Sequence, residues 1–246
     1  MNRIIVFALM LFCMTMQIEA QTLSEEEVTA KMYQAFELNK AGKKAEALEL
    51  FLIVGENTKQ QRNEGERQVY VCSQTMACQC YELLGRYQEG YLLGKSLLQG
   101  KLNDEERKDV GHLYAMNGYM YACEFIQRDE KGRADYKRGR ELISEILPYS
   151  DGQVKEYAET KIPLSWYFEG AQYAMTQSYD EALSSYEKAL NGFRDLGRVS
   201  EEVDVLSGIA SVKAHLCKFD EAKRVYYQAF FLANQNGKVK KHFVTH

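Results

Sequence analysis

The sequence is poor in proline, tryptophan and histidine. It has two prolines, one tryptophan and four histidines among 246 residues. No segment alternates apolar and polar residues for long enough to indicate a strand. Pro148 is expected to end a helix, and Pro163 is expected to start or kink one. These absences predict an all-α chain.

No recognisable catalytic or metal-binding motif is present. The four histidines belong to no nucleophile or metalloprotease pattern. They are His112, His215, His242 and His246. A metal site at Cys78 and Cys80 is disfavoured, because residues two apart on a helix point in different directions and no second Cys or His pair follows at ligand spacing. We expect no enzymatic activity, no metal and no cofactor.

Positive charge is scarce and not concentrated. The formal net charge is -4 at pH 7, whereas a protein that binds a polyanion needs a concentrated basic face. The one basic cluster, formed by Lys238, Lys240 and Lys241, is short and terminal, and a solvated tail explains it better. We expect no nucleic-acid partner.

The first twenty residues have the pattern of a secretory signal peptide. Arg3 supplies a positive charge, 4–16 is nearly all apolar, and Ala20 is a small residue at the expected cleavage point. An apolar run of this length is short for a membrane span, which needs about 20 residues. We expect cleavage after residue 20, export to the periplasm or cell envelope, and no stable membrane insertion afterwards. An uncleaved anchor is the less favoured alternative.

Export changes how the cysteines are interpreted. Without Cys13, five cysteines remain, an odd number in a compartment that favours disulfides. Reduced thiols that pack as small hydrophobic residues are the favoured interpretation. The alternative is a disulfide between Cys80 and Cys123, on neighbouring first helices.

Residues 166–189 carry a helical hairpin motif. On the expected first helix, three residues share one face at i, i+4 and i+7, and three more repeat this spacing on the expected second helix. They are Trp166, Gly170 and Tyr173, then Ala182, Tyr186 and Ala189. Tyr179 closes the turn between the helices. The small residues allow the two backbones to approach closely. This pattern resembles the tetratricopeptide repeat (TPR) family.

Weaker copies of the same pattern recur along the chain. The resemblance implies a right-handed α-solenoid of about five hairpins, expected at 24–60, 64–100, 103–148, 152–195 and 198–236, with a tail at 237–246. Extra residues at 127–133 lengthen the turn of the third hairpin. Helix starts are expected at the capping residues Ser24 and Asn103, and a helix end at Gly197. Glycines expected at close helix contacts are Gly85, Gly90, Gly94, Gly118, Gly139 and Gly170.

The resemblance implies an interaction scaffold that holds a peptide or protein segment in its concave groove. The residues expected to line this groove are Met32, Phe36, Lys40, Gln79, Tyr119, Tyr167, Met175, Ser211 and His215. A place in the core is the alternative for several of them, and for Phe36 and Tyr119 the two interpretations are equally favoured.

Two further expectations concern partners. The last helix carries apolar residues that no further helix follows to cover, namely Val225, Tyr226, Phe230 and Phe231. We therefore expect either that the chain is the front portion of a longer array or that it self-associates through this end. The layout also resembles the input half of larger exported bacterial proteins, such as repeat-bearing sensor kinases or arrays ahead of a caspase-like CHAT peptidase domain. A sensory or regulatory repeat region is therefore the alternative function.

Overall fold

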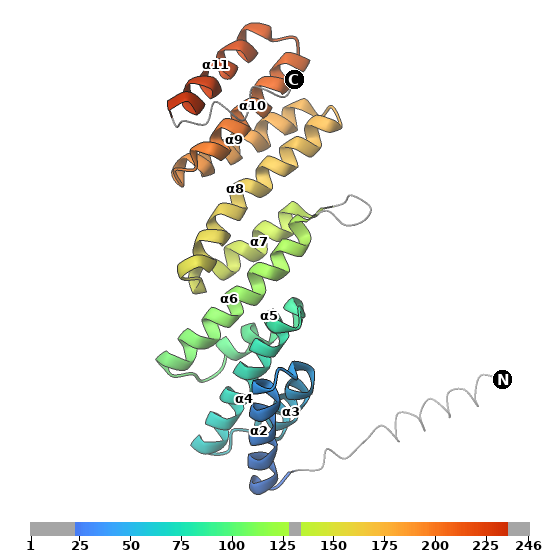
Figure 1. Cartoon of the computed structure of the whole chain (residues 1–246), viewed down its shortest axis with the longest axis vertical. Helices are drawn as coiled ribbons and strands as arrows, with labels where there is room; N and C mark the ends of the chain where they lie inside the picture. Colours follow the sequence, from blue (N-terminus) through green and yellow to red (C-terminus); the bar gives the residue numbers. More distant parts are fainter. Residues whose placement is uncertain (1–22, 128–133, 236–246) are drawn as a thin grey trace, which may run out of the picture. The chain divides into compact units, whose positions relative to one another are not determined.

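The computed structural model describes residues 23–127 and 134–235. These residues form ten α-helices and one short 3₁₀ helix, without a strand among them (Figure 1). The expected signal peptide, the tail at 237–246 and most of the 127–133 insertion lie outside the described residues. No described helix combines the length and apolar character that a bilayer crossing requires.

Contacts divide the chain into two units between Gly85 and Arg86. The boundary falls within the hairpin expected at 64–100, so its first helix lies in the first unit and its second helix in the other. We call them unit 1 and unit 2 and describe each by itself.

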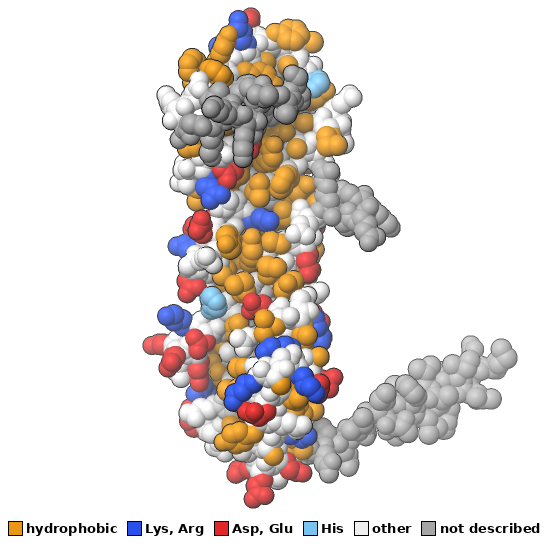
Figure 2. Space-filling model, in the orientation of Figure 1, with side chains coloured by type: hydrophobic (Ala, Val, Ile, Leu, Met, Phe, Trp, Pro, Cys, Tyr) orange, Lys and Arg blue, Asp and Glu red, His pale blue; other side chains and the backbone are white. Residues whose placement is uncertain are grey.

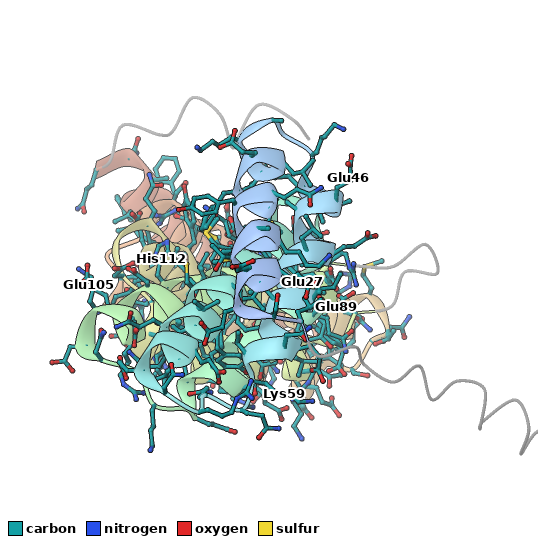
Figure 3. The ribbon with its side chains drawn as sticks, turned by 90° about the horizontal axis from the view of Figure 1, so that it is seen from below. Glu27, Glu46, Lys59, Glu89, Glu105 and His112 are labelled. Carbon is teal, nitrogen blue, oxygen red and sulfur yellow. The ribbon has the colours of Figure 1, made fainter. Side chains whose placement is uncertain are left out.

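Unit 1 consists of three helices. They are α2 (Glu25–Lys40), α3 (Lys44–Thr58) and α4 (Glu64–Leu83), and α3 packs against both α2 and α4. The expected capping box opens α2: the Glu27 amide donates to Ser24 Oγ at 3.2 Å, and the Ser24 amide donates to a Glu27 carboxylate oxygen at 2.8 Å. Glu27 is labelled on the first turn of this helix in Figure 3.

Unit 2 is a consecutive stack of helices. In chain order they are α5 (Tyr87–Leu98), α6 (Asp104–Ile126), α7 (Tyr136–Ile146), the 3₁₀ helix η1 (Leu147–Tyr149), α8 (Gly152–Met175), α9 (Tyr179–Asp195), α10 (Val199–His215) and α11 (Phe219–Gln235). Each α-helix packs against the next one, and α8 also contacts α6 and α10 (Figure 1). Packing between sequence neighbours is the arrangement of an α-solenoid, which confirms the expected fold class.

The hairpin motif at 166–189 corresponds to α8 and α9. A Cβ atom at Gly170 would lie 2.8 Å from Cδ1 of Tyr186 and 3.2 Å from the carbonyl oxygen of Ala182. The two backbones are therefore in close contact where the motif places its small residues. Pro163 lies in the interior of α8 and does not start it, and its ring packs beside Gly192 of α9.

The glycines expected at helix ends or helix contacts fall into two groups, those in turns with positive φ and those at close contacts between helices. Gly197 ends α9 with φ +64, as expected. The interpretation of Gly85 as a helix contact was wrong: its φ is +70, and nothing lies within 4 Å of the position of a Cβ, so it is a turn residue after α4. The other five glycines expected at contacts have atoms of another helix within 3.0 Å of that position.

All five described cysteines are free thiols. Cys78, Cys80 and Cys123 are buried, in agreement with the favoured interpretation, whereas Cys72 and Cys217 are exposed and do not fit it. The alternative disulfide between Cys80 and Cys123 is not formed. Cys78 is fully buried, and this burial raises the pKa of its thiol to about 12. The residues described in the structure include no group of three or more potential ligands placed to hold a metal ion.

Candidate binding surfaces

An apolar cleft lies between α2 and α4 in unit 1. Its volume is about 280 Å³, and it is lined by Val28, Thr29, Met32, Tyr33, Phe36 and Val69. Two of the residues expected in the groove, Met32 and Phe36, therefore lie in the same cleft. The rings of Phe36 and buried Phe51 pack edge to face, with 5.4 Å between their centroids, so Phe36 belongs partly to the core.

The cleft continues into a second, more polar depression of about 290 Å³. The two share Val28, Thr29 and Val69, and the second extends to Asn57 and Glu66. Apolar contacts at one end and amide and carboxylate groups at the other suit a peptide with both kinds of side chain.

The other expected groove residues of unit 1 do not line this cleft. Lys40 is exposed and forms an ion pair with Glu37 on its own helix at 2.9 Å, an arrangement common on solvated surfaces. Gln79 is exposed on α4. Tyr33 was missed by the sequence analysis, although its side chain is 71% exposed at the edge of the cleft.

The expected groove residues of unit 2 differ in their contacts and in their burial. Tyr119 of α6 stacks with Tyr157 of α8, with ring centroids 6.2 Å apart. Tyr167 is half-buried against Tyr186, and burial raises the pKa of Tyr167, with a smaller contribution from Asp204. Three further residues are exposed, namely Met175, Ser211 and His215.

His215 is held by a ring contact. Its imidazole stacks on Tyr179, with centroids 5.8 Å apart and planes within 8° of parallel. Tyr179, expected to close the α8–α9 turn, thus also contacts the next hairpin.

Figure 2 shows apolar side chains gathered along the viewed face of unit 2. Exposed aromatic residues of α8 include Tyr157 and Phe168.

A larger cleft that the sequence analysis missed lies between α7 and α9, with α8 as its floor. Its volume is about 860 Å³. It is lined by Lys137, Arg140, Glu141 and Ser144 from α7, by Ile162, Trp166, Glu169 and Tyr173 from α8, and by Glu181, Ser184, Ser185 and Lys188 from α9. We call it the α7–α9 cleft.

Two cations lie close to Trp166 in this cleft. The Arg140 guanidinium carbon lies 3.4 Å from the centroid of the indole ring and the Lys188 ammonium nitrogen lies 4.1 Å from it. One cation comes from α7 and the other from α9, and the π-system of the indole stabilises both charges.

Arg140 is further fixed by Glu169. Their ion pair measures 3.1 Å, and the side chains are only 11% and 17% exposed. Arg140 also donates a hydrogen bond to Ser165 Oγ at 3.3 Å. The sequence could not indicate this cluster, because its residues come from three helices and Trp166 matches a packing position of the hairpin motif.

A polar cluster joins α5, α6 and α7. One carboxylate, that of Glu145, accepts hydrogen bonds from the hydroxyls of Tyr91 at 3.0 Å and Tyr114 at 2.7 Å, and Lys95 lies 2.7 Å from it. Burial alone would raise the pKa of Glu145, but the bonds from Lys95 and the tyrosines outweigh burial and hold this pKa below its ordinary value.

The expected apolar end of the last helix is partly exposed. Tyr226 and Phe231 are exposed, whereas Val225 and Phe230 are half-buried, and Phe219 and Tyr227 add to the exposed surface. Self-association through α11 remains a prediction.

No protein-family model matches the chain, and no curated protein matches it. Solved structures similar to it include the apo form of RapI, 15% identical over 86% of this chain and 72% of that chain, with a TM-score of 0.36. The TPR protein TTC0263 of Thermus thermophilus is 16% identical over 87% of this chain and 95% of its own, with a TM-score of 0.34. The Q17M form of TPR-like repeats of a Podosopora anserina kinesin light chain is 15% identical over 86% and 96%, with a TM-score of 0.35. The assignment as a helical repeat rests on the helix order and contacts of the chain itself.

Proposed function

We propose that this protein is an interaction scaffold that binds an apolar peptide segment of a partner protein in the cleft between α2 and α4. The observation that carries the proposal is the cleft lined by Met32 and Phe36, apolar along most of its length and open at the surface beside Tyr33. Apolar side chains in an open cleft are in contact with water, and covering them with a ligand lowers the free energy of the complex.

The chemistry of the lining favours a short amphipathic segment as the ligand. Methionine adapts its shape to different apolar side chains, and exposed tyrosines combine a large contact area with a hydroxyl that can bind the peptide backbone. The adjoining polar depression at Asn57 and Glu66 supplies hydrogen-bond partners.

We further propose that the mature chain begins near Gln21 and acts in the cell envelope. The N-terminal sequence of the exported protein tests where the mature chain begins.

The binding proposal is tested by selecting peptides from a random library on the mature chain. The affinity of a selected peptide is then measured by calorimetry. We expect Met32→Ala to weaken binding about tenfold, which is about 1.4 kcal/mol and typical of an apolar residue central to an interface. Gln79→Ala is the matched control, because Gln79 is exposed on α4 outside the cleft, and it should leave the affinity unchanged.

Stability must be measured on the same variants. Because Met32 is only half-buried, Met32→Ala should still fold, and circular dichroism should show an unchanged helical signal for this variant. Selected peptides that bind wild type and Met32→Ala equally well would show that this cleft is not the site.

A further inference from the structure

We propose that the α7–α9 cleft is a second binding site, which takes an acidic peptide segment in an extended conformation. This site is separate from the cleft between α2 and α4, it lies wholly within unit 2, and six of its twelve lining residues are charged.

The dimensions suit a short extended peptide. The floor of the cleft runs along α8 from Ile162 to Tyr173, a length of about 16 Å at about 1.5 Å per helical residue. An extended chain covers about 3.3 Å per residue, so about five residues fit along the floor. The volume of about 860 Å³ lies in the range of ligand-binding clefts.

The charges of the lining are not all satisfied within the protein. Arg140 is paired with Glu169, and Glu141 is paired with Arg138 at 3.5 Å. The positive charges of Lys137 on α7 and Lys188 on α9 remain, and neither lysine forms an ion pair with the described residues. Glu181 is the one lining carboxylate that has no ion pair with the part of the chain described here.

Against the single unpaired carboxylate of Glu181, the two lysines leave the cleft with one unpaired positive charge in excess. Carboxylate groups of a bound peptide are the complementary partners. The apolar surfaces of Ile162 and Tyr173 on the floor suit the small or apolar residues between the acidic ones.

Lys188 is held in place before any ligand binds. Its ammonium nitrogen lies 4.1 Å from the centroid of the Trp166 ring, which also contacts the Arg140 guanidinium. A lysine fixed in this way loses less side-chain entropy on binding than a freely moving one. The hydroxyls of Ser144 and Ser184 line the same cleft and can donate to a carboxylate or to the peptide backbone.

Trp166 makes the site directly observable, because it is the only tryptophan in the sequence. The probe is the blocked peptide Glu-Ala-Glu-Ala-Glu, titrated into the mature chain at low salt while tryptophan fluorescence is recorded. Its matched control is Gln-Ala-Gln-Ala-Gln, and free glutamate tests a small-molecule ligand. We expect a saturable change in tryptophan fluorescence with the acidic peptide. The affinity of this peptide should fall in 0.5 M salt, and the neutral peptide and free glutamate should each bind at least tenfold more weakly.

Three variants assign the response to the cleft. Lys188→Gln should weaken binding of the acidic peptide about tenfold, and Lys137→Gln several-fold. Glu169→Gln removes the internal competitor for Arg140 and should tighten binding several-fold. Lys223→Gln is the control, because Lys223 on α11 also lies over an aromatic ring, that of Tyr227, but outside the cleft.

The outcomes are distinct. No saturable response, an equal response to the neutral peptide, or unchanged affinity in the double variant Lys188→Gln/Lys137→Gln would overturn the proposal. Free glutamate binding as tightly as the peptide would also overturn it, because the site would then take a small carboxylate. Met32→Ala should leave this response unchanged, so the two proposals can fail independently.

Discussion

Replacing Gly170 by alanine tests the close packing of α8 on α9. Within a helix, alanine is favoured over glycine by about 1 kcal/mol, so without any contact the variant would be more stable than wild type. In the structure the added Cβ would lie 2.8 Å from Cδ1 of Tyr186 and 3.2 Å from the Ala182 carbonyl oxygen. The Tyr186 ring is buried and packed against Tyr167, and the carbonyl belongs to the backbone of α9, so neither can move away easily.

The two effects can be compared in magnitude. Inserting a methyl group into a close-packed contact costs about 1–3 kcal/mol. Since the gain in helix propensity offsets about 1 kcal/mol of this cost, we expect the free energy of unfolding to fall by about 1 kcal/mol.

Gly111→Ala is the matched control, a glycine inside α6. Its added Cβ would meet only Tyr149, at 3.4 Å, which is an ordinary contact. This variant should therefore gain up to about 1 kcal/mol. Urea unfolding is followed by circular dichroism and by fluorescence of Trp166, which lies one turn before Gly170 on α8. If both variants were stabilised equally, the two helices would not approach as closely as the structure shows.

Two further predictions concern titratable groups. Because the pKa of Glu145 is lowered in the folded protein, its stabilisation is complete above the ordinary value of 4.5 and is lost as the pH falls through the lowered pKa. Acid should therefore reduce the free energy of unfolding more in wild type than in Glu145→Gln, measured by urea unfolding between pH 6 and about 3; equal losses would contradict the role of this carboxylate. For the thiols, we expect a maleimide to modify exposed Cys72 and Cys217 first and Cys78 last, because Cys78 is buried and its pKa is raised to about 12. Peptide mapping after timed labelling reads the order, and early modification of Cys78 would contradict its burial.

Local features of the fold could be predicted well from the sequence. The capping boxes at Ser24 and Asn103 are both formed, because each depends on residues three positions apart. The hairpin at 166–189 was also predictable, since the positions of Gly170 and Ala182 follow from how closely two neighbouring helices must pack.

Features that depend on residues far apart in the sequence were not predictable. The boundary after Gly85 divides an expected hairpin, and no local residue pattern distinguishes that turn from the others. Pro163 lies inside α8, so of its two expected roles the helix start was wrong, and the sequence did not indicate that its ring packs beside Gly192 of the next helix. Among the expected groove residues, Met32 and Phe36 line one cleft. The sequence pattern did not indicate that His215 stacks on Tyr179 of another helix.

The α7–α9 cleft shows why recognising a repeat does not identify what it binds. On α9, Ala182 and Tyr186 are constrained by packing against Gly170, so almost any repeat of this kind needs similar residues there. Ser184 and Lys188 lie on the same helix but face the cleft, where packing sets no such requirement. Their chemistry is free to vary without loss of the fold. Specificity should therefore reside at such positions, and variants at Lys188 should change binding while variants at Gly170 change stability.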